Sequence, residues 1–126
     1  MKTNPTPYES QEQAALFQML KMLENKYPDL QWAFHVPNGG YRNAREAANF
    51  SRQGVKSGVP DIILPLPTKT HHGLFIELKR QQGGTLSKNQ KRWIAALNRF
   101  GYKAVVCEGA QEALDVILEY MKEVEY

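Results

Sequence analysis

Residues 59–79, VPDIILPLPTKTHHGLFIELK, contain two short apolar runs on either side of a polar loop. The first run covers residues 59–66 and the second covers 74–79, and both have the length and the branched side chains of strands. The second is apolar enough to predict a central position in a sheet. In a strand, Glu77 and Lys79 point to one face and Leu78 to the other. If the two runs pair as a hairpin, Asp61 lies near Glu77 although the two are far apart in the chain.

Two carboxylates and an amine at a sheet edge make a plausible site for a hard cation such as Mg²⁺ or Mn²⁺. Such a site suits phosphodiester hydrolysis, because a bound cation activates water and stabilises the attacking and leaving oxygens. A structural explanation exists for each residue. Asp61 could be a turn residue at a strand entry, and Glu77 could form an ion pair with Lys79 or Arg80. Glu77 needs a partner of some kind, because an unpaired carboxylate inside an apolar run is costly to bury.

The rest of the sequence predicts an α/β fold with a mixed central β-sheet flanked by helices. The further elements that we expect are a helix over 7–27, a strand over 30–36, a helix over 43–53, a helix from Ser87 to Gly101, a strand over 102–107 and a helix over 110–121. In the helix after Ser87, the spacing Ser87-x-x-Gln90 predicts a capping box. The apolar stripe of that helix contains Trp93, Ile94, Leu97 and Phe100.

Length and composition indicate one globular domain spanning residues 1–126. No apolar run approaches the roughly eighteen residues of a membrane span, so no membrane partner is expected. The single cysteine, Cys107, excludes an internal disulfide framework. It ends an apolar run and is interpreted as inert core. These features fit a reducing, cytoplasmic compartment in a bacterial cell or a virus-infected host cell.

Charge is unevenly distributed along the chain. Residues 79–103 contain seven basic side chains and no acid, whereas the chain from residue 104 onward is predominantly acidic. This polarity indicates one basic face for a polyanion, although two solvated helix faces would give the same pattern. Lys88, Arg92 and Arg99 follow at spacings of four and seven, on one face of a helix, with Lys91 beside them. We expect these four residues to contact nucleic-acid phosphates.

Several motifs occur in an order that resembles a known family. The pair Pro60-Asp61 followed by Glu77-x-Lys79 resembles the PD-(D/E)xK nuclease superfamily. The longer series PNGGYR (37–42), GVKSGVPD (54–61), GLFIELKR (73–80) and SKNQ (87–90) resembles the VRR-Nuc family in its stand-alone, virus-type form. The resemblance covers most of the chain. It implies a restriction-endonuclease-like core within the α/β fold.

The resemblance also implies roles for individual residues. Asp61 and Glu77 would bind Mg²⁺ or Mn²⁺ together with the backbone carbonyl of Leu78, and Lys79 would assist the attacking water. A helix-one acid would complete the site. Glu9, in the context Glu9-Ser-x-x-Gln13, is preferred over Glu12, although either could simply be an acid favoured in a first helical turn.

Two further motifs have both a functional and a structural interpretation. Gln90 could act in the active site, or only in the capping box. Asn38 and Arg42 belong to a glycine-rich segment that could approach a nucleic-acid backbone, or that could be an ordinary tight turn.

The function expected from the resemblance is that of a metal-dependent DNA endonuclease. It would form a homodimer and cut branched DNA, including four-way (Holliday) junctions. Two other classes of function are compatible with the sequence. One is a non-catalytic nucleic-acid-binding module on a nuclease scaffold, and the other is a metal-dependent phosphatase acting on a small substrate. Retention of both acids and Lys79 argues against the first, and the basic surface argues against the second.

Overall fold

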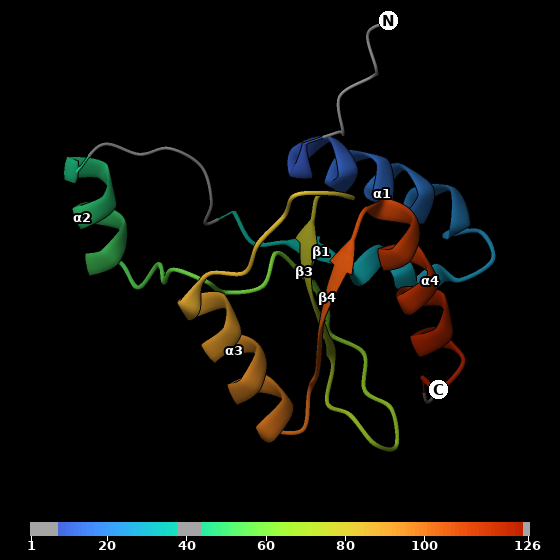
Figure 1. Cartoon of the computed structure of the whole chain (residues 1–126). Helices are drawn as coiled ribbons and strands as arrows, with labels where there is room; N and C mark the ends of the chain where they lie inside the picture. Colours follow the sequence, from blue (N-terminus) through green and yellow to red (C-terminus); the bar gives the residue numbers. More distant parts are fainter. Residues whose placement is uncertain (1–7, 38–43, 125–126) are drawn as a thin grey trace, which may run out of the picture.

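The computed structural model describes residues 8–37 and 44–124. Within these ranges the elements are, in chain order, α1 (Glu9–Leu23), the 3₁₀ helix η1 (Pro28–Trp32), β1 (Phe34–His35), α2 (Ala44–Arg52), β2 (Ile62–Leu64), β3 (Leu74–Lys79), α3 (Lys88–Arg99), β4 (Lys103–Glu108) and α4 (Ala110–Met121). Their order confirms the α/β class predicted from the sequence (Figure 1). Asn38 and Arg42 lie outside the described residues.

Two predicted strands are shorter than expected because proline residues lie in or beside them. In the predicted strand over 30–36, residues up to Trp32 belong to η1, which Pro28 opens with a backbone angle suited to a helical turn. Only Phe34 and His35 pair as a strand. In the predicted strand over 59–66, only Ile62–Leu64 pair, because Pro60 and Pro65 have no N–H to donate to a neighbouring strand.

The sheet is mixed, with the strand order β1-β2-β3-β4. β1, β2 and β3 are antiparallel neighbours, and β3 and β4 run parallel. β3 therefore lies between two partners, as its apolar sequence predicts. Ile62 pairs with Ile76, so the same register continued by one residue places Asp61 opposite Glu77.

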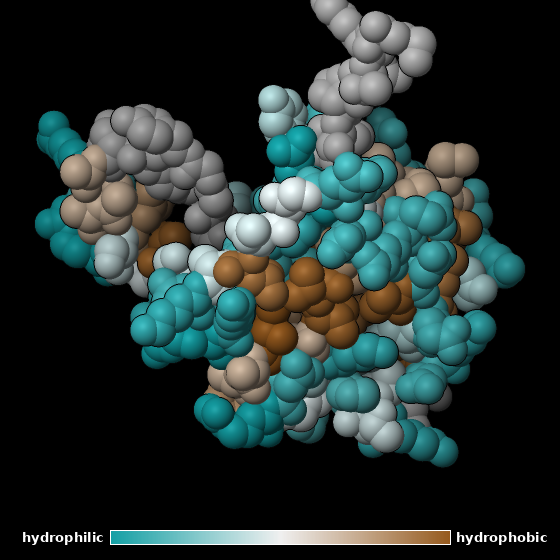
Figure 2. Space-filling view, in the orientation of Figure 1, coloured by the Kyte–Doolittle hydropathy of each residue, from teal (hydrophilic) through white to brown (hydrophobic). Residues whose placement is uncertain are grey.

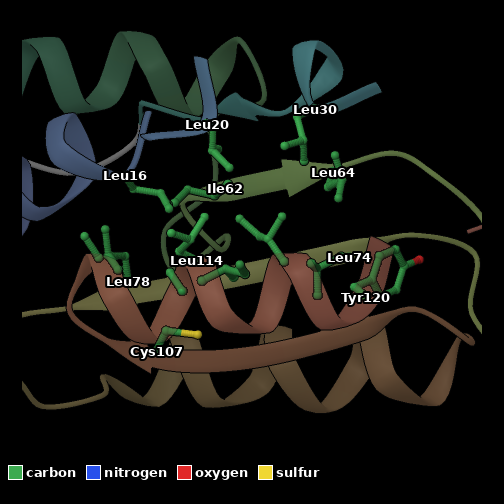
Figure 3. Close-up of a cluster of buried hydrophobic side chains, with 14 of the residues drawn as sticks. Leu16, Leu20, Leu30, Ile62, Leu64, Leu74, Leu78, Cys107, Leu114 and Tyr120 are labelled. Atoms are coloured by element: carbon green, nitrogen blue, oxygen red, sulfur yellow. The ribbon is translucent and has the colours of Figure 1, made fainter. Parts of the chain in front are cut away.

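The hydrophobic core lies between one face of the sheet and the helices α1 and α4. Leucine and isoleucine side chains from β2 and β3 meet α1 and α4 there (Figure 3). Cys107 of β4 is completely buried in this core, which confirms that it is a core residue. α3 packs on the other face, mainly against β4. The sheet is thus covered on both faces, as the alternation of strands and helices predicts.

Two features of the surface differ from an ordinary packed domain. α2 has no buried residue and stands away from the sheet (Figure 1). Phe100, which we expected on the inward stripe of α3, is 58% exposed, whereas Leu97 is buried. Phe100 is the C-cap residue of α3, and its side chain lies on the surface. None of the helices within 8–37 and 44–124 is long and apolar enough to cross a membrane.

Candidate active site

The hairpin of β2 and β3 brings the two predicted acids together. Asp61 precedes β2, and its Oδ2 accepts a hydrogen bond of 2.9 Å from the backbone N–H of Leu78. The backbone carbonyl of Asp61 lies 2.9 Å from Nδ1 of His35 and accepts the N–H of Val36 at 2.7 Å. Asp61 is therefore fixed from β3 and from the segment around β1.

Glu77 is the most confined acid of the site, with only 2% of its surface exposed. Its Oε1 accepts a hydrogen bond of 2.7 Å from Nε2 of Gln90 and lies 3.6 Å from Nζ of Lys79. Its Oε2 is buried, and among the residues that the structure describes no donor reaches it. An ionised Glu77 carboxylate, buried there beside the Asp61 carboxylate, is unfavourable. A hard cation that accepts oxygen ligands would satisfy it.

The pKa values of the two acids also favour a bound cation. Burial, and secondarily the neighbouring Asp61 carboxylate, raises the pKa of Glu77 to about 8. Burial also raises the pKa of Asp61, although the Leu78 N–H and the charges of His35 and Lys79 oppose it. Without a cation, the pair therefore holds a proton more tightly than two separate carboxyls would. A divalent cation would remove this penalty for ionisation.

Lys79 joins the acids to the first helix and to α3. Its side chain is only 9% exposed. Nζ donates a hydrogen bond of 3.0 Å to Oε1 of Gln90 and lies 4.0 Å from Oε1 of Glu9. The predicted Glu77–Lys79 proximity is confirmed, and it belongs to a larger cluster rather than to an isolated ion pair.

Gln90 forms the predicted capping box and also contacts the acid cluster. It forms the capping box of α3: Oε1 accepts the Ser87 N–H at 2.9 Å, and Oγ of Ser87 accepts the Gln90 N–H at 3.1 Å. The same side chain contacts Glu77 and Lys79. Because the cap fixes its orientation, Gln90 is a rigid link between the start of α3 and β3.

The structure separates the two acids of the first helix. Glu9 is close to the Lys79 ammonium, and its charge contributes to the raised pKa of Glu77. Glu12 is 5% exposed and accepts hydrogen bonds of 3.0 and 3.4 Å from Nε2 of Gln81. Glu12 therefore connects α1 to the residues that follow β3, whereas Glu9 faces the cluster.

The described residues supply few ligands for a metal ion. Among residues 8–37 and 44–124, no three His, Cys, Asp or Glu side chains gather closely enough to hold one. The carboxylates of Asp61 and Glu77 are the two that meet. This donor set still fits Mg²⁺, which is usually held by one or two carboxylates and retains several waters.

Sequence reasoning missed the role of Gly58. Its φ is +89°, and a Cβ atom at this position would lie 2.6 Å from the backbone carbon of Asn89 and 2.8 Å from the Gln90 nitrogen. The segment that leads to Asp61 therefore lies directly on the first turn of α3. The available signal was the glycine shortly before Pro60-Asp61. No comparable signal marked Gln81 or His35.

The four basic residues of α3 are all exposed, as the prediction requires. Lys88, Lys91, Arg92 and Arg99 thus lie on the surface of the helix that carries Gln90. Their contact with DNA remains a prediction.

Comparisons with known proteins agree with this arrangement. The VRR-NUC domain family matches residues 8–111. A solved structure described as a VRR_NUC domain protein aligns with a TM-score of 0.81 and 29% sequence identity, over 97% of this chain and 94% of that chain. No curated protein matches the chain.

Proposed function

The chain belongs to the VRR-NUC domain family, a nuclease-type family, and we propose that it is a metal-dependent endonuclease acting on branched DNA. Family membership confirms the resemblance noted in the sequence. The match to a solved VRR_NUC domain structure supports the same family assignment. The metal, the substrate structure and the residue roles given below are parts of the proposal.

The observation that carries the proposal is the buried, unsatisfied Oε2 of Glu77 beside Asp61 and Lys79. No described residue donates a hydrogen bond to this oxygen, and the neighbouring carboxyl makes two negative charges unfavourable without a cation. Asp61, Glu77 and the carbonyl of Leu78 would hold Mg²⁺ or Mn²⁺, with Glu9 as the next nearest acid. A bound ion would supply an activated water and stabilise the leaving oxygen.

The remaining side chains have roles that follow from their contacts. The Lys79 ammonium has three N–H donors, and the bond to Gln90 uses one. It can therefore donate to a phosphate oxygen as negative charge develops there, or orient the attacking water. Gln90 keeps Lys79 and Glu77 in place and is chiefly a positioning residue. Glu12, which is hydrogen-bonded to Gln81, would be structural.

The preference for branched DNA and the homodimer follow from the resemblance to stand-alone members of the family. A two-fold dimer would place two active sites in fixed geometry. A four-way junction offers equivalent strands to two such sites. The basic residues of α3 would contact the phosphates of its arms.

A cleavage assay tests the proposed function. Purified protein is incubated with linear duplex, single strand, flap and four-way junction in Mg²⁺, Mn²⁺ or EDTA, and light scattering gives the mass in solution. We expect cutting of branched DNA only with a metal, and a mass twice that of the 14.4 kDa chain.

Variants assign the cleavage to this site. Asp61→Asn and Glu77→Gln should abolish it, whereas Glu12→Gln should retain it. Circular dichroism confirms that each variant is folded. Cleavage by folded Asp61→Asn protein at the normal rate would contradict the mechanism, and a monomer that cuts duplex and junction equally would remove the preference for branches.

A further inference from the structure

A groove with a volume of about 780 Å³ lies beside the active site. It runs between the end of α2, the segment 55–57 and the exposed side of α3, which face each other in Figure 1. In the space-filling view, the α2 region stands apart from the body of the protein, and apolar side chains lie in the recess next to it (Figure 2). No residue of the acid cluster lines this groove.

The lining of the groove combines positive charge with aromatic surface. Lys56, Arg92 and Arg99 supply the charge, and none of the described lining residues is acidic. Trp93 is half-buried in the wall, whereas Phe100 is 58% exposed at the end of α3. The Arg99 guanidinium lies 5.1 Å from the centre of the Phe100 ring. A cationic groove with accessible ring faces is the arrangement that binds unpaired nucleic-acid strands.

The groove adjoins the active site through the first turn of α3. Asn89 lines the groove, and the next residue, Gln90, contacts Glu77 and Lys79. Gly58, which lies against Asn89, follows the groove residues Lys56 and Ser57 and precedes Asp61. The groove and the acid cluster therefore share the first turn of α3 and the segment that leads to Asp61.

We infer that this groove binds an unpaired DNA strand. Its bases stack on Phe100 and Trp93, and its phosphates lie near Lys56, Arg92 and Arg99. A fully paired duplex does not fit this chemistry, because its bases stack on each other and offer no free faces. The inference rests on the proposed function and narrows it: among branched substrates, a flap with an unpaired strand next to the cut phosphodiester should be preferred to a four-way junction, whose arms are paired.

The test measures binding in EDTA, so it does not depend on cleavage. A fluorescent oligothymidine of about 12 nucleotides, within the usual site sizes, is titrated and its anisotropy is recorded. Phe100→Ala should weaken binding roughly 5- to 100-fold, as expected for the loss of one stacked base. Trp32→Ala removes a similarly exposed aromatic residue, 54% exposed on η1, and should leave the affinity unchanged.

Two further measurements keep the result interpretable if Phe100→Ala does not fold. Phe100→Tyr should retain binding, and Phe100→Leu should lose it, because leucine keeps the apolar contact but offers no ring. The chain has two tryptophans, so in a Trp32→Phe background Trp93 is the only one. Its fluorescence should be quenched by the oligothymidine.

Several results would overturn the inference. One is unchanged affinity in Phe100→Leu together with unquenched Trp93. Another is a fall in dimer mass in the Phe100 variants without loss of oligothymidine binding, which would assign the groove to a second copy of the chain. If oligothymidine binds in this way but no metal supports cleavage, the proposed function is refuted and the inference about the groove is not. If the protein cleaves DNA and the Phe100 variants bind oligothymidine as the wild type does, the inference about the groove is refuted and the proposed function is not.

Discussion

Replacing Glu77 by glutamine should stabilise the metal-free protein while it destroys the proposed metal site. Glutamine keeps the shape of the side chain and an oxygen that can accept the Gln90 amide hydrogen, and its own amide can donate to Asp61. It cannot ionise. In the wild-type protein the folded-state pKa of Glu77, about 8, lies above its ordinary value of 4.5. The stability that the neutral form contributes is therefore fully present below pH 4.5 and is lost as the pH rises through 8.

The size of the effect follows from that interval. Each pKa unit corresponds to about 1.4 kcal/mol, so the shift sets an upper limit of about 5 kcal/mol on the stability lost above pH 8. Relaxation around a buried charge lowers such costs. We therefore expect Glu77→Gln to raise the free energy of unfolding by about 2–4 kcal/mol at about pH 8, and by much less near pH 5. Saturating Mg²⁺ should stabilise the wild-type protein, by about 2.7 kcal/mol at a hundred times the dissociation constant, and should not affect the variant.

Urea unfolding followed by circular dichroism, in EDTA at about pH 5 and about pH 8, measures these differences. Glu119→Gln is the matched control, because it removes the same charge from a side chain that is 69% exposed and paired with exposed Lys122. Its stability should follow that of the wild type at both pH values. A Glu77→Gln protein no more stable than wild type at about pH 8 would refute the argument that Glu77 is a buried, strained carboxyl.

Three further predictions concern residues around the site. Gly58→Ala should lower the free energy of unfolding by about 2–3 kcal/mol, because Gly58 has a left-handed backbone and lies against Asn89. A decrease below about 0.5 kcal/mol in urea unfolding would contradict that contact. Gln90→Ala should slow cleavage roughly 10- to 100-fold in a folded protein, because Glu77 and Lys79 lose their common partner. An unchanged rate of cleavage would show that Gln90 only caps α3. Burial raises the pKa of the Cys107 thiol to about 12, so a thiol reagent at neutral pH should label it only after urea is added, and rapid labelling of the native protein would show that β4 is not buried there.

The sequence is sufficient to predict the centre of this site because each feature depends on local chemistry. Alternation in the run around Glu77 determines which side chains share a face, and hairpin pairing then places Asp61 beside it. The capping box of Gln90 requires only a spacing of three residues. These rules use only residues within the hairpin and at the start of the helix, so they do not require knowledge of the rest of the fold.

Other features depend on contacts between distant segments and could not be predicted. Glu9 and Glu12 lie three residues apart on the same side of a helix, so periodicity cannot distinguish them. Their surroundings differ because Gln81 donates hydrogen bonds to Glu12, whereas the Lys79 ammonium lies near Glu9. Similarly, the exposure of Phe100 and the tight approach of Gly58 depend on which segments lie beside α3, and the sequence of α3 does not contain that information.

The most direct test of the central claim is anomalous diffraction from a crystal soaked in Mn²⁺. We predict a single strong peak at the cluster, about 2 Å from a carboxylate oxygen of both Asp61 and Glu77, and no such peak in crystals of Glu77→Gln protein. A Mn²⁺ peak at Glu12 and Gln81, or no peak near Glu77 when the wild-type crystals are saturated, would contradict the account.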